Sequence, residues 1–307
     1  MSQNVIETHN LSKHFGPVKA LDQVNLIVNK GTTTGLVGPN GAGKTTLFSL
    51  LCGFLKPTSG SIQVLGHHAD SAHIRGRISI LPQDATLLKS LPVGKQLSML
   101  AELQGMNKKA AQSEAVRVLK LVDLYQSFNQ LPERLSHGML KRVAIAQALM
   151  GEPEIIMLDE PTAGLDPNTS DAIKAVIRKL GQTSTIIISS HNLEVIEDLC
   201  EKIIILRKGQ LHSHEMVADL TSRTKALTFK LDKDPEANVA DIFKSLPLVT
   251  AVKLGQPGQH RMVVYFKDDG ESMAEIEIIK CMAVAGVTYR EMVRGERLQD
   301  TVSDRMR

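Results

Sequence analysis

The feature that most restricts the fold is a glycine-rich segment between the apolar run 33–37 and a helical pattern. It fits the pattern G-x-x-x-x-G-K-[ST], which binds phosphate when a strand precedes it and a helix follows it. Glycines let the backbone curl until successive N–H groups point at phosphate oxygens, and the helix N-terminus adds partial positive charge. The segment therefore predicts a phosphate loop with these members: Gly38, Pro39, Asn40, Gly41, Ala42, Gly43, Lys44, Thr45 and Thr46.

Two side chains of this loop carry chemistry of their own. The Lys44 ammonium can neutralise phosphate charge, and the Thr45 hydroxyl can be a ligand of Mg²⁺. The alternative is a glycine-rich turn that precedes a helix by chance. That alternative does not account for the full pattern together with both flanks, so we expect a nucleotide site.

Composition and charge exclude several classes of protein. The 307 residues suit one large domain plus a small one, or two domains. A net charge of +3 is too small to indicate a nucleic-acid partner or an acidic membrane surface. The three cysteines fit no metal or redox spacing, and no apolar stretch approaches the ~18 residues of a membrane span. We expect reduced thiols and no secretory signal. Because no stretch is long enough to span a membrane, any link to a membrane must run through a partner.

Apolar segments that alternate with helical patterns predict the main sheet. The segments 33–37, 154–159 and 185–190 are nearly all apolar, and helical patterns follow them at 47–51, 168–180 and 193–200. Such strands are typical of a parallel sheet covered on both faces, so we predict an α/β fold. Because ligands of these sheets bind at the carboxyl ends of the strands, the phosphate loop, Asp159, Glu160 and His191 are expected to meet there.

The N-terminal part adds further strands. Strands are expected at 5–11 and 21–28, with a turn at 13–17 that contains Phe15. Phe15 could stack on an adenine ring or lie tucked under that turn. Another strand is expected at 61–65, followed by a turn with His67 and His68. A metal site is disfavoured there, because adjacent side chains of an extended segment point to opposite faces and no third ligand is evident.

The rest of the chain predicts a helical insert and a second domain. Helices are expected at 95–103, 108–122 and 139–149, so the segment from about 85 to 150 is mainly helical. After about residue 220 the order strand, helix, strand, strand, helix, strand predicts a small α+β domain at 221–307 of the ferredoxin-like, split βαβ type. A last helix is expected at 297–306. Since this part shows no catalytic constellation, we interpret it as a structural or dimerisation extension of the domain 1–220.

Two carboxylates lie where the segment 154–159 ends. Asp159 is placed to hold a Mg²⁺ that bridges phosphates, and Glu160 can polarise a water molecule for in-line attack. Either alone is compatible with an ordinary strand-end acid, but together with the phosphate loop they predict nucleotide hydrolysis. His191 alone would be a structural loop histidine. Beside these groups it is better interpreted as a donor to the γ-phosphate that orients the attacking water.

Between Val5 and about Leu220 the chain resembles the ATP-binding cassette of ABC transporters. That cassette is a P-loop NTPase with an N-terminal antiparallel β subdomain and a helical insert. Six motifs occur in the family's order. Besides the phosphate loop they are Gln83 in LPQD, the signature LSHGM at 135–139, the strand IIMLDEP at 155–161, the loop AGLD at 163–166 and His191.

The resemblance implies a homodimer in which two chains, head to tail, sandwich two ATP molecules. Ser136 and Gly138 of one chain would then contact the γ-phosphate held by the other, with Asp166 in the loop at the dimer interface. Phe15 would take the place of the adenine-stacking aromatic residue. Gln83 would bind or sense Mg²⁺ and the attacking water. The cofactors implied are ATP and Mg²⁺.

The resemblance also implies a membrane permease as partner, with the segment 84–103 near the contact. The chain would then lie at the cytoplasmic face of the inner membrane and bind no nucleic acid. It is most similar to single-cassette bacterial exporters with a small C-terminal extension. Two alternatives stay open: a soluble ABC-type ATPase that acts on ribosomes or DNA, and a degenerate cassette that binds ATP without turnover. The presence of Glu160 and His191 argues against the second.

One departure from the family pattern lies in the signature, which is commonly LSGGQ. Here His137 replaces a glycine, and Met139 removes an amide that could bond to nucleotide. If the backbone at His137 required a positive φ, a non-glycine residue would cost roughly 1 kcal/mol or more. The departure concerns the strength of dimer closure rather than hydrolysis itself.

Overall fold

The computed structural model describes residues 3–222, 225–236, 239–255, 258–267, 273–298 and 302. The chain forms two compact units, Met1–Glu215 and Met216–Arg307. The boundary that the sequence places near residue 220 falls inside the short helix α7 (Val217–Ser222), which belongs to the second unit.

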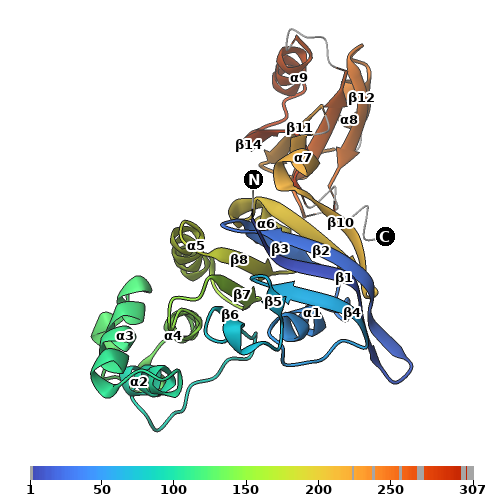
Figure 1. The fold of residues 1–307 in the computed structure, drawn as a ribbon. Helices are drawn as coiled ribbons and strands as arrows, with labels where there is room; N and C mark the ends of the chain where they lie inside the picture. The colour runs from blue at the N-terminus through green and yellow to red at the C-terminus, as the bar shows by residue number, and fades with distance from the viewer. Residues whose placement is uncertain are drawn as a thin grey trace. The chain divides into compact units, whose positions relative to one another are not determined.

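A six-stranded sheet forms the centre of the first unit, with the order β10-β9-β3-β8-β7-β6 (Figure 1). From β9 to β6 the neighbouring strands run parallel. Every residue of β3, β7 and β8 is buried, as the apolar runs predict, and the α/β fold is confirmed. The strands are β3 (Thr33–Val37), β6 (Ile78–Leu81), β7 (Ile155–Asp159), β8 (Thr185–Ser189), β9 (Lys202–Arg207) and β10 (Gln210–Met216).

Three helices pack on the strands of the first unit. Helix α1 (Lys44–Leu51) buries four apolar side chains in a core that it shares with strands of both sheets of this unit. Helix α5 (Pro167–Gly181) contacts β8, and α6 (Leu193–Leu199) contacts β3. The short loops that lead into these helices therefore begin at the carboxyl ends of β3, β7 and β8, where a ligand is expected.

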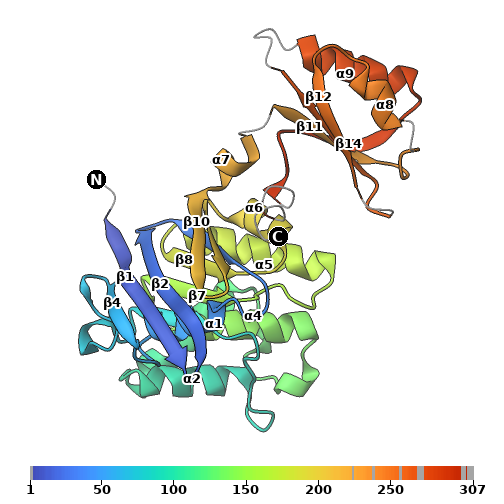
Figure 2. The same cartoon turned by 90° about the vertical axis from the view of Figure 1, so that its right-hand side faces the viewer.

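The second sheet of the first unit is the antiparallel one expected at the N-terminus (Figure 2). Its strands, in the order β2-β1-β4-β5, are β1 (Asn4–Phe15), β2 (Val18–Asn29), β4 (Ser59–Val64) and β5 (His67–His68). β1 and β2 extend beyond the predicted strands, since they form one hairpin that pairs Phe15 with Val18. The turn expected at 13–17 is thus reduced to two residues.

The predicted turn around the two histidines is also shorter than expected. Leu65 and Gly66, both with positive φ, make the turn, and His67 and His68 already pair with Val64 and Gln63. A two-residue turn with positive φ at both positions suits a tight hairpin, which the sequence pattern did not indicate. His67 and His68 therefore belong to a strand and not to a solvated turn.

The helical insert contains α2 (Val93–Leu103), α3 (Lys108–Leu121) and α4 (His137–Ala148). Short 3₁₀ turns lie in the insert at Tyr125–Ser127 and Pro132–Arg134, and another lies before it at Ala72–Ile74. Helices α2 and α3, green in Figure 1, pack on each other and on α4, which contacts β6. Helix α4 begins two residues before the expected start at Met139, because the Ser136 hydroxyl accepts the Met139 N–H and caps the helix.

The second unit contains the predicted strand and helix order. After α7 come β11 (Ala226–Leu231), α8 (Val239–Lys244), β12 (Val249–Leu254), β13 (Arg261–Phe266), α9 (Met273–Val284) and β14 (Tyr289–Arg294). The sheet order β12-β13-β11-β14, with antiparallel neighbours, is that of a split βαβ fold. The helix expected at 297–306 lies outside the described residues except for positions 297, 298 and 302. Within the described ranges, no helix combines the length and the apolar character needed to span a membrane.

Candidate functional site

The phosphate loop connects β3 to α1 and is held in place by backbone contacts. A Cβ atom on Gly38 would lie 2.3 Å from the Leu206 carbonyl oxygen, so only glycine fits there. Gly43 has φ 105° and is the N-cap of α1, without a side-chain hydrogen bond to cap the helix. The first N–H groups of α1 are therefore available for an anion.

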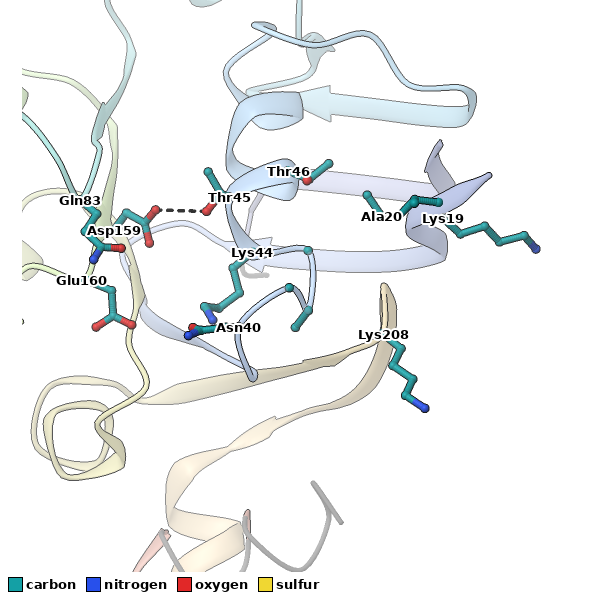
Figure 3. A pocket seen from close by; sticks show the side chains of 14 residues that line it. Lys19, Ala20, Asn40, Lys44, Thr45, Thr46, Gln83, Asp159, Glu160 and Lys208 are labelled. Atoms are coloured by element: carbon teal, nitrogen blue, oxygen red, sulfur yellow. Dashed lines mark hydrogen bonds between the residues drawn. The ribbon is translucent and has the colours of Figure 1, made fainter. Parts of the chain in front are cut away.

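A cavity of about 320 Å³ opens over this loop (Figure 3). The loop forms one wall, and the carboxyl ends of β6 and β7 form another. Residues predicted from the sequence that line it are Asn40, Gly41, Ala42, Gly43, Lys44, Thr45, Thr46, Gln83, Asp159 and Glu160. Gly38 and Pro39 are not lining residues, but their carbonyl oxygens accept hydrogen bonds from Lys44 Nζ at 2.6 and 3.3 Å. The structure thus brings most of the predicted site together.

Asp159 and Thr45 form the part of the site suited to a cation. Thr45 Oγ1 donates to Asp159 Oδ2 at 3.4 Å, drawn as a dashed line in Figure 3, and Ser189 Oγ donates to the other carboxylate oxygen. These are hard oxygen ligands of the kind that Mg²⁺ prefers, and Mg²⁺ commonly binds through one or two protein oxygens plus substrate phosphates. The described residues contain no cluster of three or more His, Cys, Asp or Glu arranged for a metal. The pair fits Mg²⁺ held jointly with a nucleotide.

Glu160 and His191 meet because β7 and β8 are parallel neighbours. The His191 N–H donates to Glu160 Oε1 at 2.9 Å, and His191 Nδ1 lies 2.8 Å from the same oxygen. Glu160 is buried, whereas 70% of the His191 side chain is exposed. Glu160 also has φ 50°, a left-handed conformation that costs of order 1 kcal/mol for a non-glycine residue. The surrounding bonds hold this carboxylate in one orientation at the edge of the cavity.

Phe15 does not line the cavity. It is the last residue of β1, about half exposed, and the Lys13 ammonium lies 5.2 Å from its ring centroid. Its hairpin partner Val18 does line the cavity, so Phe15 lies beside the site and not under a turn.

Sequence reasoning missed four lining residues: Val18, Lys19, Ala20 and Lys208. They come from the start of β2 and from the turn between β9 and β10. The turn contacts the phosphate loop directly, since the Gly209 N–H donates to the Ala42 carbonyl oxygen at 3.0 Å. The sequence signal for Lys208 was only a hairpin turn, Lys208-Gly209, without any indication that it reaches the loop.

The signature residues Ser136 and Gly138 line a different and smaller pocket, of about 190 Å³. Its other members are Met139, Arg142, Asn168, Thr169 and Ala172. Gly138 is buried against α5, and a Cβ atom there would lie 2.2 Å from Thr169 Cγ2. His137 lies in the first turn of α4 and is not among the residues with positive φ, so the strain considered for a non-glycine residue is not present.

Asp166 is the N-cap of α5 and lines neither pocket. Its carboxylate accepts from Thr169 Oγ1 at 2.7 Å and from the Thr169 N–H at 3.0 Å. These hydrogen bonds lower the pKa of Asp166 below its ordinary value. Thr169 thus forms hydrogen bonds with Asp166, and its methyl group lies against Gly138.

Comparison with known proteins identifies the first unit. The family model described as ABC transporter matches residues 21–163. The linearmycin resistance ATP-binding protein LnrL of Bacillus subtilis is 33% identical over 222 residues, 71% of each chain. The bacitracin transport ATP-binding protein BcrA of Bacillus licheniformis is 36% identical over 240 residues, 76% of this chain and 78% of that one. The methionine import ATP-binding protein MetN 1 of Oenococcus oeni is 31% identical over 298 residues, 93% and 85%.

Solved structures agree with these relatives. A dimeric ATP-binding cassette in a post-hydrolysis state, bound to ADP and Pi, superposes with a TM-score of 0.62 at 28% identity, covering 69% of this chain and 98% of that one. The protein cbiO1 of Clostridium perfringens, part of an ABC transporter complex, gives a TM-score of 0.65 at 28% identity, covering 71% and 90%. The chain belongs to the ABC transporter family as an ATP-binding protein that hydrolyses ATP.

Proposed function

We propose that two copies of this chain sandwich two Mg²⁺·ATP molecules and drive a separately encoded membrane permease, in the direction of export. In this proposal the chain lies peripherally at the cytoplasmic face of the inner membrane. ATP binding closes the dimer, and hydrolysis to ADP and phosphate reopens it.

One observation carries the dimer. The phosphate-loop cavity and the signature pocket share no lining residue, although both are built within one unit of the chain. Ser136, at the start of α4, is exposed and does not line the cavity that contains Lys44. A second copy that places its α4 start over the phosphate loop would bring two helix N-termini to one triphosphate, that of α1, which has no side-chain cap, and that of α4 with Ser136.

The residues of the cavity then have distinct roles. Lys44 and the loop N–H groups bind the β- and γ-phosphates, and Thr45, Asp159 and Gln83 hold or sense Mg²⁺, which neutralises developing charge. Glu160 polarises the attacking water, since its buried carboxylate is fixed by His191 at the cavity edge. His191 orients that water and the γ-phosphate. Phe15, whose hairpin partner Val18 lines the cavity, stacks on the base of the nucleotide in this proposal.

Export is supported by relatives named for resistance to linearmycin and daunorubicin. The relative named for methionine import covers a larger share of this chain and supports the opposite direction. A strain that lacks this chain distinguishes export from import. Hypersensitivity to an antibiotic supports export, whereas loss of amino-acid uptake with unchanged sensitivity contradicts it.

The dimer is tested with Glu160→Gln, which keeps the shape of the site and removes the base. With Mg²⁺ and ATP, this variant should elute as a dimer in gel filtration, and without nucleotide as a monomer. Lys44→Met in the same background is the matched control and should stay monomeric. An ATP-loaded Glu160→Gln chain that remains monomeric would contradict the sandwich.

The permease is tested by purification from membranes. The tagged chain should be recovered from detergent extracts with an integral membrane protein. Recovery with ribosomes or DNA, and with no membrane protein, would favour the alternative of an ABC-type ATPase without a permease.

For the second unit, we propose a structural or dimerisation extension. Its split βαβ core, with Leu227, Phe229, Phe243 and Ile278 fully buried, is separate from the core of the first unit. Removing residues after Glu215 should weaken the ATP-dependent dimer. Unchanged dimerisation and transport would contradict this role.

A further inference from the structure

A lysine of the signature helix contacts the loop that follows β6 in its own chain. Lys141 lies in the second turn of α4, and its Nζ donates to the backbone carbonyl oxygen of Gln83 at 3.3 Å. Gln83 follows β6 and lines the phosphate-loop cavity. A single side chain thus joins the helix that begins at Ser136 to the loop that contains Gln83.

The surroundings of this ammonium are acidic. Partial burial lowers the pKa of Lys141, and the carboxylates of Asp159, Asp84 and Glu160 oppose that lowering. Asp159 and Glu160 are themselves buried at the cavity edge. Lys141 therefore supplies positive charge close to Asp159, the proposed cation ligand, and to Glu160.

The two ends of α4 are held differently. Near its C-terminal end, Ser79 Oγ of β6 donates to the Ala148 carbonyl oxygen, and Arg117 of α3 donates to that of Leu149 at 2.9 Å. Near its start, Gly138 packs against Thr169, and Lys141 makes the hydrogen bond to the Gln83 loop. If the Lys141 bond is lost, the start of α4 can shift while its other end stays anchored to β6 and α3.

We propose that Lys141 is a positioning residue that holds the start of α4 against the Gln83 loop, and that a cation bound between Thr45 and Asp159 weakens this hold. A cation bound at Asp159 cancels the attraction between that carboxylate and the Lys141 ammonium. The cation also repels the ammonium directly, because both carry positive charge. The start of α4 is then freed when the cavity of its own chain is loaded. This inference rests on the proposed function and deepens it, because a start of α4 that can move is able to adjust its position when the dimer closes.

Amide hydrogen exchange of the nucleotide-free chain tests the hold. In Lys141→Met, amides at 83–88 and 136–142 should exchange about fivefold faster than in the wild type, the effect expected from one lost hydrogen bond. Lys141→Arg keeps a cationic donor and should stay close to the wild type. Lys109→Met removes an exposed charge from α3 of the same insert and is the matched control. Equal exchange in wild type and Lys141→Met would overturn the proposal.

Adding Mg²⁺·ADP tests the effect of a cation. ADP lacks the γ-phosphate that a sandwich requires, so exchange reports on a single chain. Wild-type exchange at 83–88 should rise towards that of Lys141→Met, which should itself change little, and ADP with a chelator should have no such effect. Unchanged or slower exchange in the wild type would overturn the role of the cation. Because these measurements need no dimer, they can succeed or fail independently of the Glu160→Gln gel filtration.

Discussion

The phosphate loop and the signature helix are fixed by different means. The phosphate loop packs closely on backbone atoms. Gly38 lies against the carbonyl group of Leu206, and Gly43 lies against the carbonyl group of Ala20. The start of α4 depends on side chains, namely the Ser136 hydroxyl, the Lys141 ammonium and the Thr169 methyl group. A loop held by backbone can change only if the fold changes, whereas a helix start held by side chains can shift when one bond is exchanged.

The N-termini of α1 and α4 also differ, because only that of α4 is held by a side chain. Helix α1 has no side-chain cap, but α4 is capped by Ser136, whose hydroxyl accepts the Met139 N–H at 3.3 Å. An anion at α1 meets N–H groups without a competing side chain. At α4 it must share or replace the Ser136 hydroxyl. An anion can therefore bind at α1 without displacing a side chain, whereas at α4 it would have to compete with the cap.

The largest effect is expected at Glu160, the proposed general base beside the phosphate loop. Glu160→Gln should lower ATP turnover by about 10²–10⁴-fold, the range for loss of a general base, without lowering ATP affinity. Phosphate release measures turnover, and fluorescent-nucleotide binding measures affinity. Glu201→Gln changes an exposed carboxylate of the same unit and serves as control. Turnover equal to the wild type would remove Glu160 from the mechanism.

Loss of the loop lysine should be the next largest effect. Lys44→Met should weaken ATP binding by about 100-fold, because a charge-assisted contact to phosphate is lost at a rigid site. Lys208→Met removes a lysine that lines the same cavity from the β9–β10 turn and should cost less. Calorimetric titration with ATP gives both values. A larger loss for Lys208 than for Lys44 would show that the turn, and not the loop, dominates phosphate binding.

The signature glycine should matter for stability even without nucleotide. Gly138→Ala should destabilise the chain by about 1–3 kcal/mol through overpacking against Thr169. In a helix with free space the same change would instead stabilise by roughly 1 kcal/mol. Urea unfolding measures the difference. Thr169→Ser removes the methyl group involved and should recover most of the loss, and a Gly138→Ala chain as stable as the wild type would contradict this packing.

The smallest effect concerns the anchored end of α4. Glu114 accepts from the Gly151 N–H at 2.7 Å and pairs with Arg117, and the hydrogen bond from Arg117 is the main cause that lowers the pKa of Glu114. A carboxyl with a lowered folded-state pKa contributes stability above its unfolded pKa and loses it as pH falls through the folded value. Glu114→Gln should therefore cost about 1 kcal/mol at neutral pH and progressively less below about pH 4.3.

Denaturant unfolding at several pH values checks this expectation, with Glu102→Gln, an exposed change on α2, as control. A loss of stability in Glu114→Gln that is the same at every pH would show that shape rather than charge anchors this end of α4.

The sequence alone determined the phosphate loop, the strands β3, β7 and β8 and the two carboxylates at the end of β7. These follow from local patterns: glycine spacing, unbroken apolar runs and the edge at which parallel strands end. Local patterns also misplaced several boundaries. The start of α4 depends on a cap by Ser136, and the lengths of β1 and β2 depend on their pairing with each other.

Only the tertiary structure decided which distant residues complete the site. Lys208 reaches the phosphate loop because the Gly209 N–H bonds to Ala42, and Lys141 reaches Gln83 across 58 positions of sequence. Neither lysine stands out in the sequence, because a surface lysine in a turn or helix is common and its meaning depends on what the fold brings beside it. The tertiary structure likewise separates the signature from the phosphate loop of its own chain, because the two line different pockets.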